Sequence, residues 1–196
     1  MEACRLSATN LACRRGERFL FAGLSLALES GEALQVAGPN GMGKSSLIRI
    51  LAGLLRPYEG AVEREGMVAL LDEKPALDEY LPLGKALDFW SGIDGEGHLA
   101  REGVIDSVGL ADLLDVPVRY LSTGQRKRAA IARMIGQQAS IWLLDEALNG
   151  LDRDAVAMTE SLVADHCQAG GIAVIASHQA FDLPGLRSMQ LAEFAQ

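Results

Sequence analysis

The chain has 196 residues, of which 49% are hydrophobic and 22% are charged, as in a soluble globular protein with one domain. No run approaches the roughly 18 consecutive apolar residues that a membrane-spanning helix needs. The formal net charge of −8 argues against a nucleic-acid-binding surface, so we expect no nucleic-acid partner.

Residues 1–37 have the pattern of short strands, with turn residues at 14–17 and 29–32, which predicts a small N-terminal antiparallel β region. The first residues lack the basic and then apolar layout of a signal peptide, so we expect the protein to stay in the cytoplasm. Cys4, Cys13 and Cys167 have no zinc-ligand spacing and fit reduced thiols.

A glycine-rich segment follows a predicted strand at 33–37 and precedes a predicted buried helix at 47–55, which Pro57 cannot extend. The segment fits the pattern G-x-x-x-x-G-K-[ST], in the strand–loop–helix context that this pattern requires. We expect it to hold a phosphate chain. The expected phosphate-binding residues are Gly38, Pro39, Asn40, Gly41, Met42, Gly43, Lys44, Ser45 and Ser46.

Glycine residues allow consecutive backbone N–H groups to point at one anion, and the helix that begins near Gly43 adds its own free N–H groups. Lys44 can reach the β- and γ-phosphates of a nucleoside triphosphate, and the Ser45 hydroxyl can ligate Mg²⁺. The alternative is a plain glycine-rich turn with a solvated Lys44. The loop by itself does not say what is done with the nucleotide.

The middle of the chain changes from strands to helices. Residues 61–72 have the pattern of a short hairpin and then a strand at 67–71, whereas apolar residues between 75 and 138 recur mostly at helical spacing. Strand patterns return at 141–144 and 172–176, separated by a helix at about 154–168. We therefore predict a single α/β domain whose core covers about 1–72 and 139–196, with an inserted helical subdomain at about 75–138.

Residues 121–125 precede the helix that carries Arg126, Lys127, Arg128 and Arg133, a basic cluster that we interpret as a solvated or structural face. Ser122 is a good N-cap, so an ordinary helix start is one interpretation. The Ser122 hydroxyl, the Gly124 N–H and the helix N-terminus together also form a second anion site. That site makes sense if it contacts the γ-phosphate of a nucleotide held by another copy.

The strand at 141–144 runs into two carboxylates, Asp145 and Glu146. Asp145 is placed to hold Mg²⁺ opposite Ser45, and Glu146 to act as general base toward a water at the γ-phosphorus. His178 follows the strand at 172–176, where a sensor of the γ-phosphate would lie. The alternatives are a solvated strand end and a structural histidine.

Together these motifs resemble the nucleotide-binding domain of ABC transporters, and the resemblance covers essentially the whole chain. It implies that residues 121–125 are the signature, so that Gln125 joins Ser122 and Gly124 at ATP. It also implies that residues 148–152 form the dimer-contact loop, which contributes Asp152, and that His178 is the switch histidine. Segments 13–25 and 170–179 are similar to one branch, the ATP-binding subunit of the haem exporter of cytochrome c maturation.

Two positions depart from the family pattern. Arg15 stands where most relatives stack an aromatic ring on adenine, and its guanidinium plane can substitute for that ring. Lys74 aligns with a glutamine that contacts Mg²⁺ and the attacking water; an ammonium cannot ligate a cation, but it can touch the γ-phosphate. A register shift of one residue would instead place Glu73 at the metal.

The resemblance implies an α/β fold of the P-loop NTPase, ABC type, and an ATPase that uses ATP and Mg²⁺. It implies a head-to-tail dimer of two copies and integral membrane partners of the haem-exporter type, on the cytoplasmic side of the bacterial inner membrane. No residue of the chain is expected to ligate haem. Two alternatives remain: a small-molecule kinase, and a nucleotide-gated interaction module with little turnover.

Overall fold

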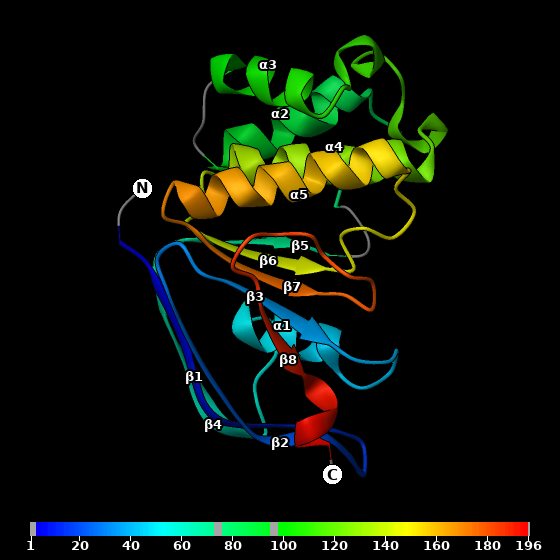
Figure 1. The fold of residues 1–196 in the computed structure, drawn as a ribbon. Coiled ribbons are helices and arrows are strands. Elements are labelled where there is room, and N and C mark those ends of the chain that lie inside the picture. Colours follow the sequence, from blue (N-terminus) through cyan, green and yellow to red (C-terminus); the bar gives the residue numbers. More distant parts are fainter. Residues whose placement is uncertain (1–2, 73–75, 95–97, 196) are drawn as a thin grey trace.

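The structure is a computed structural model that describes residues 3–72, 76–94 and 98–195. A parallel sheet runs through the middle of the molecule and has helices on both of its faces (Figure 1). An antiparallel sheet lies on one side, beyond the helix on that face. The parallel sheet has the strand order β5-β6-β7-β3-β8. Its strands are β3 (Ala33–Ala37), β5 (Val68–Leu71), β6 (Ile141–Asp145), β7 (Ile172–Ala176) and β8 (Arg187–Gln190).

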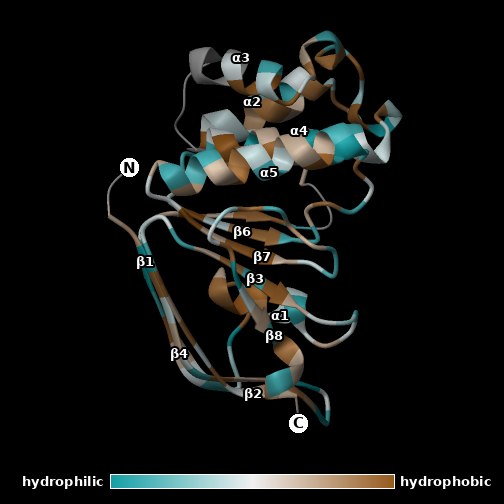
Figure 2. Ribbon diagram, in the orientation of Figure 1, coloured by the Kyte–Doolittle hydropathy of each residue, from teal (hydrophilic) through white to brown (hydrophobic). Residues whose placement is uncertain are grey.

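Every residue of β6 and β7 is buried. A parallel sheet covered by helices on both faces requires this, because neither side of a strand meets water. Figure 2 shows the corresponding hydrophobic colour along both strands. The carboxyl ends of β3, β6 and β7 point to the same edge of the sheet (Figure 1), so the loops that follow them meet there.

The antiparallel sheet has the order β2-β1-β4 and consists of β1 (Arg5–Arg15), β2 (Arg18–Glu29) and β4 (Glu59–Glu65). Helix α1 (Lys44–Leu51) lies between the two sheets (Figure 1), and its Leu47, Ile48 and Leu51 belong to the apolar core that joins them. This core fixes the start of α1, and with it the glycine-rich loop.

The other face of the parallel sheet is covered by helices (Figure 1). They are α4 (Thr123–Gly136) and α5 (Arg153–Gln168), with α2 (Leu83–Asp94) and α3 (His98–Ser107) packed on α4 and the short 3₁₀ turns η1 (Ala111–Leu113) and η2 (Val118–Tyr120) nearby. A third 3₁₀ turn, η3 (Leu191–Phe194), packs against β2 on the opposite side of the sheet. None of the helices in the described ranges is long and apolar enough to cross a membrane. The predicted α/β class with helices inside 75–138 is confirmed, while the domain bounds stay a prediction.

The predicted hairpin within 61–72 is wrong. β4 pairs with β1 in the antiparallel sheet, whereas β5 pairs with β6 in the parallel one. The chain passes from one sheet to the other at Gly66, whose φ of 121° is open to glycine and to few other residues. A side chain at position 66 would also overlap the Ser140 hydroxyl.

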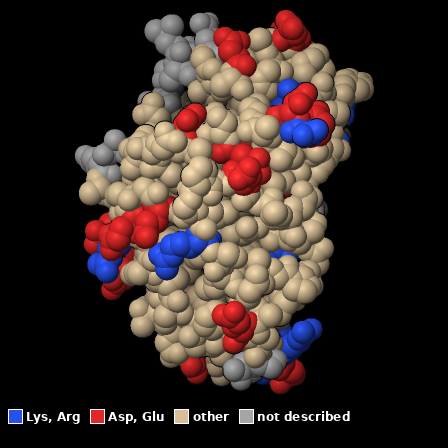
Figure 3. Space-filling model, in the orientation of Figure 1, with Lys and Arg blue, Asp and Glu red and all other residues tan. Residues whose placement is uncertain are grey.

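The basic cluster on α4 is largely structural. Lys127 is only 6% exposed, Arg128 donates hydrogen bonds to the carbonyls of Val108 and Gly109, and the Arg133 guanidinium lies 3.5 Å from the centre of the Trp90 ring. These cations hold α4 against the neighbouring helices. On the face drawn in Figure 3, charged side chains lie in small separate groups, some acidic alone and some mixed.

Candidate functional site

The glycine-rich loop connects β3 to α1 through backbone conformations that favour glycine. Gly38, Gly41 and Gly43 have φ angles of 149°, 81° and 105°. Gly43 is the N-cap residue of α1, and a Cβ atom there would lie 3.1 Å from the Cβ of Leu20. The loop therefore packs closely against β2. The first N–H groups of α1 have no partner within the helix and can bind an anion.

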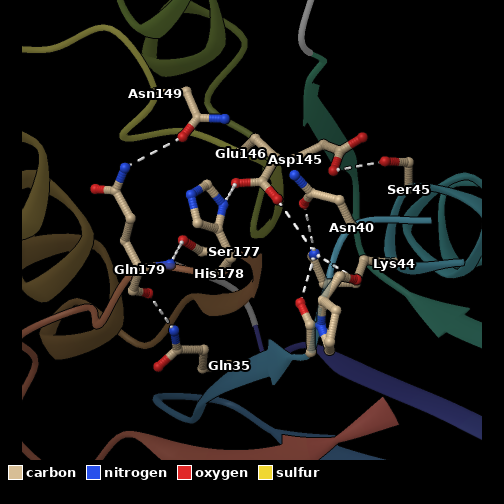
Figure 4. A network of polar contacts seen from close by, with 12 residues as sticks. Gln35, Asn40, Lys44, Ser45, Asp145, Glu146, Asn149, Ser177, His178 and Gln179 are labelled. Atoms are coloured by element: carbon tan, nitrogen blue, oxygen red, sulfur yellow. Dashed lines mark hydrogen bonds and ion pairs between the residues drawn. The ribbon is translucent and has the colours of Figure 1, made fainter. Parts of the chain in front are cut away.

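Lys44 places its ammonium group inside this loop (Figure 4). The side chain is only 5% exposed. Its Nζ donates hydrogen bonds to the carbonyl of Gly38 at 2.8 Å, the carbonyl of Pro39 at 3.3 Å and Oδ1 of Asn40 at 3.4 Å. The positive charge therefore lies where the loop would place the outer phosphates of a nucleotide.

Glu146 joins the lysine to the histidine (Figure 4). Its Oε1 lies 3.4 Å from Nζ of Lys44, and its Oε2 lies 2.9 Å from Nδ1 of His178. The backbone of Glu146 has a φ of 49°, an unusual value for a residue other than glycine. That conformation turns the carboxylate from the end of β6 toward the loop. The predicted catalytic residues Lys44, Glu146 and His178 thus lie in contact.

Ser45 and Asp145 form the second polar pair of the site. The Ser45 hydroxyl donates to Oδ1 of Asp145 at 3.0 Å. Burial raises the pKa of Asp145, the Ser45 hydrogen bond opposes that rise, and repulsion from Asp72 and Glu146 adds to it. One hydroxyl and one carboxylate side by side are hard oxygen ligands, a set that suits Mg²⁺ completed by water and phosphate oxygens.

A chain of amide side chains beside the site was not predicted from the residue pattern. Gln179 donates from Nε2 to Oδ1 of Asn149 at 3.3 Å, and its carbonyl accepts from the Gln35 side chain at 2.7 Å. The Gln179 backbone N–H also donates to the Ser177 hydroxyl at 3.0 Å. These bonds tie the loop after β6 to the loop after β7 (Figure 4). Asn149 and Gln179 stand close in the sequence to Glu146 and His178, which is the signal that could have found them, whereas Gln35 has no such signal.

The signature residues begin α4 with a complete capping box. The Ser122 hydroxyl accepts from the Gln125 N–H at 3.1 Å, and the Gln125 side chain accepts from the Ser122 N–H at 2.8 Å. The ordinary helix start considered above is therefore present, and the hydroxyl hydrogen of Ser122 is still able to donate. Gly124 lies close to Gly150: a Cβ atom added at Gly124 would be 3.3 Å from the carbonyl oxygen of Gly150.

The pocket at the glycine-rich loop does not include the signature. Ser122, Gly124 and Gln125 are absent from the described residues that line it. The lining residues are Leu20, Asn40, Gly41, Gly43, Lys44, Ser45, Ser46, Glu146 and Asn149. A single copy therefore presents the two predicted anion sites separately.

The remaining predicted site residues are placed as follows. Asp152 caps α5, because its carboxylate accepts from the Ala155 N–H at 2.8 Å. Arg15 is exposed at the end of β1, opposite Arg18 in the β1–β2 pair. Lys74 and Glu73 lie outside the described residues, so their competing roles stay predictions.

The sequence and the fold of this chain are similar to those of known proteins. A family model described as "ABC transporter" matches residues 21–149. The chain belongs to the ABC transporter family. This ABC protein is 55% identical over 194 residues to the cytochrome c biogenesis ATP-binding export protein CcmA of Novosphingobium aromaticivorans, with 99% of each chain covered.

A second relative with the same description comes from Sphingopyxis alaskensis. It is 51% identical to this ABC protein over 191 residues, which cover 97% of this chain and 98% of the relative. Among solved structures, one titled as the ATP-binding subunit of an ABC transporter superposes with a TM-score of 0.81 at 21% identity. That match covers 88% of this chain and 79% of the other and supports the fold.

Proposed function

We propose that this chain is the ATP-binding and ATP-hydrolysing subunit of an ABC transporter that acts in cytochrome c biogenesis. The observation that carries the proposal is the contact of Lys44, Glu146 and His178 at the mouth of a glycine-rich loop, with Ser45 and Asp145 paired beside them. The printed names of the relatives support the cytochrome c role.

ATP would bind with its phosphates along the loop, where the γ-phosphate competes with Glu146 for the ammonium of Lys44. Glu146 would then be held by His178 alone and could accept a proton from a water that attacks the γ-phosphorus. His178 keeps that carboxylate directed toward the phosphate. Loss of the γ-phosphate returns Lys44 to Glu146.

Ser45 and Asp145 would hold Mg²⁺, which when bound neutralises charge that develops on the β- and γ-phosphate oxygens. The role of Asp145 requires its carboxylate form. Its raised pKa makes that form costly without a cation, and a nearby cation would lower the pKa again.

Two copies would close head to tail around two ATP molecules, because the signature residues do not line the pocket of their own chain. Ser122 and Gly124 of one copy would then contact the γ-phosphate held by the other. Integral membrane subunits of the haem-exporter type would place the dimer on the cytoplasmic side of the inner membrane. This subunit would drive their conformational change without itself binding haem.

The variant Glu146→Gln tests the catalytic part of the proposal. It keeps the size and shape of the side chain but removes the base, so we expect it to bind ATP and to lose most of its phosphate release. Phosphate release with no acceptor present is the measurement, which also distinguishes an ATPase from a kinase. Glu63→Gln, on exposed β4, is the matched control. Hydrolysis at the wild-type rate by Glu146→Gln would remove Glu146 from the mechanism.

A further inference from the structure

An exposed group of aromatic rings precedes the signature. We call Tyr80, Arg119 and Tyr120 the tyrosine–arginine cluster. Tyr80 is 76% exposed and Tyr120 is 67% exposed. The Arg119 guanidinium lies 4.7 Å from the centre of the Tyr120 ring and 5.4 Å from that of Tyr80. Two large exposed rings gathered around one cation make a binding surface more readily than two isolated surface rings do.

Hydrogen bonds hold the backbone beneath the cluster and join two of its side chains. Arg119 donates from Nη2 to the Tyr120 hydroxyl at 3.0 Å, and its backbone N–H donates to the carbonyl of Glu79 at 3.0 Å. Next to it, the Val118 N–H donates to the carbonyl of Leu81 at 3.0 Å. These bonds fix η2 against the segment that carries Tyr80. The backbone at Tyr120 is therefore ordered before any ligand binds, and the bond from Arg119 favours one orientation of the ring, which lowers the entropy that binding would cost.

The pocket at the glycine-rich loop has no aromatic ring among its described lining residues. Its described lining contains Leu20, polar side chains and glycine, but no tyrosine, phenylalanine or tryptophan. Arg15, the residue expected to stack on adenine, is exposed at the end of β1 and is not part of that lining.

The position of Tyr120 connects these two observations. It lies two residues before Ser122, a distance of at most about 7 Å along the chain. The N-terminus of α4 lies at the edge of the molecule to which β3, β6 and β7 point, as does the glycine-rich loop (Figure 1). In the proposed head-to-tail dimer, Ser122 meets the γ-phosphate of the nucleotide on the facing copy. Tyr120 then reaches toward the same nucleotide from the partner's side.

We propose that Tyr120, oriented by Arg119, stacks on the base of the nucleotide bound by the second copy of this chain. The inference rests on the proposed head-to-tail dimer. Arg119 lies over one face of the ring, a base would stack on the other, and the guanidinium adds positive charge near the nucleotide. Tyr120 would supply an aromatic contact in trans and would be a base-binding residue of the composite site.

The test uses dimerisation driven by nucleotide in a Glu146→Gln background, where closed dimers are not lost to hydrolysis. Sedimentation velocity gives the nucleotide concentration at half-maximal dimer, first with ATP and then with ribose 5′-triphosphate, which has the same phosphates but no base. Three changes are added to the background: Tyr120→Ala, Tyr120→Phe and, as the control, Phe89→Ala. Phe89 is also a large exposed ring, at 60% exposure, but it lies on α2.

Tyr120→Ala should raise the required ATP concentration about tenfold, the size of one lost base–aromatic stack. It should leave the required concentration of ribose 5′-triphosphate unchanged, because that ligand has no base to stack. Tyr120→Phe keeps the ring and should stay near the parent in ATP, as should Phe89→Ala.

Two results would overturn the inference and leave the proposed function intact: no effect of Tyr120→Ala with ATP, or the same effect with both ligands. The second result would mean that Tyr120 contacts protein and not the base. Failure of the Glu146→Gln parent to dimerise with ATP would instead overturn the proposed dimer and the trans contact together.

Discussion

Lys44 shows how one side chain depends on a whole loop. Its ammonium is almost fully buried, yet it contacts two backbone carbonyls, an amide oxygen and the carboxylate of Glu146. A buried cation requires such partners. An incoming phosphate would therefore replace contacts that already exist, and the lysine is positioned for it in advance.

Lys44→Ala should weaken ATP binding by about 1.5–3 kcal/mol, the size of a lost charge-assisted hydrogen bond to phosphate. Isothermal titration with ATP and Mg²⁺ measures the loss. Lys85→Ala, which removes an exposed cation of α2, is the control and should leave the affinity unchanged. Equal affinities for Lys44→Ala and the wild type would contradict the phosphate-loop interpretation.

Several residues of the site could be predicted from the sequence, because the spacing between them along the chain determines their positions. The pattern around Lys44 and the strand before Asp145 each required one local element, and both elements are present. The contact between Glu146 and Lys44 was not predictable. It depends on the left-handed backbone at Glu146, and nothing in the residue types around position 146 indicates that conformation.

At the scale of elements, α5 is joined to the parallel sheet by a stack of two rings. The His166 ring lies 3.8 Å from the Trp142 ring of β6, with 7° between their planes. His166 is 7% exposed, and burial lowers its pKa, while the carbonyls of Ile172 and Ser140 favour the charged form less strongly. The neutral imidazole is therefore the form that packs between α5 and β6.

Acid should weaken this packing. Because the folded-state pKa of His166 lies below the unfolded value of about 6.5, the unfolded chain binds more protons as pH falls through 6.5 toward the folded pKa. The free energy of unfolding should fall in that window. Urea unfolding at pH 8 and pH 5.5 should show a smaller acid loss for His166→Phe, which keeps a ring that cannot titrate. Equal losses in both proteins would contradict this account.

Gly171 has no side chain, and the His166 ring occupies the space that a side chain at position 171 would need. A Cβ atom at position 171 would overlap ring atoms of His166, so Gly171→Ala should lower the free energy of unfolding by about 1–3 kcal/mol through overpacking. The cost should shrink in the His166→Ala background, where the ring is gone. Gly136→Ala, at a helical glycine with open space around it, is the control. An equal cost with and without the His166 ring would rule out the steric explanation.

The elements were predicted well where one stretch of chain determines them. The buried runs that became β6 and β7 and the helix between them needed only local apolar patterns. β4 was misassigned because strand pairing depends on distant segments: its partner β1 lies about 50 residues earlier in the chain. The strand predicted at 67–71 is present as β5, whereas local propensity does not reveal that residues 59–65 pair with β1.

At the scale of the molecule, the two predicted anion sites lie at one edge of the sheet but do not form one pocket. Lys44 and Glu146 line the pocket, and Ser122 and Gly124 begin a helix outside its lining. One chain thus carries both halves of a site without completing it. The sequence predicted the two halves, and their completion by a second copy stays a prediction, since it is a property of the pair.

ATP hydrolysis by mixed variants, measured with the membrane subunits present, tests the composite site most directly. Lys44→Ala and Ser122→Arg should each be inactive alone, because every site in either homodimer has one defective half. An equal mixture should regain activity, since each heterodimer has one site that combines a normal Lys44 with a normal Ser122. Activity no greater than the sum of the separate variants, in mixtures shown to contain heterodimers, would contradict the account.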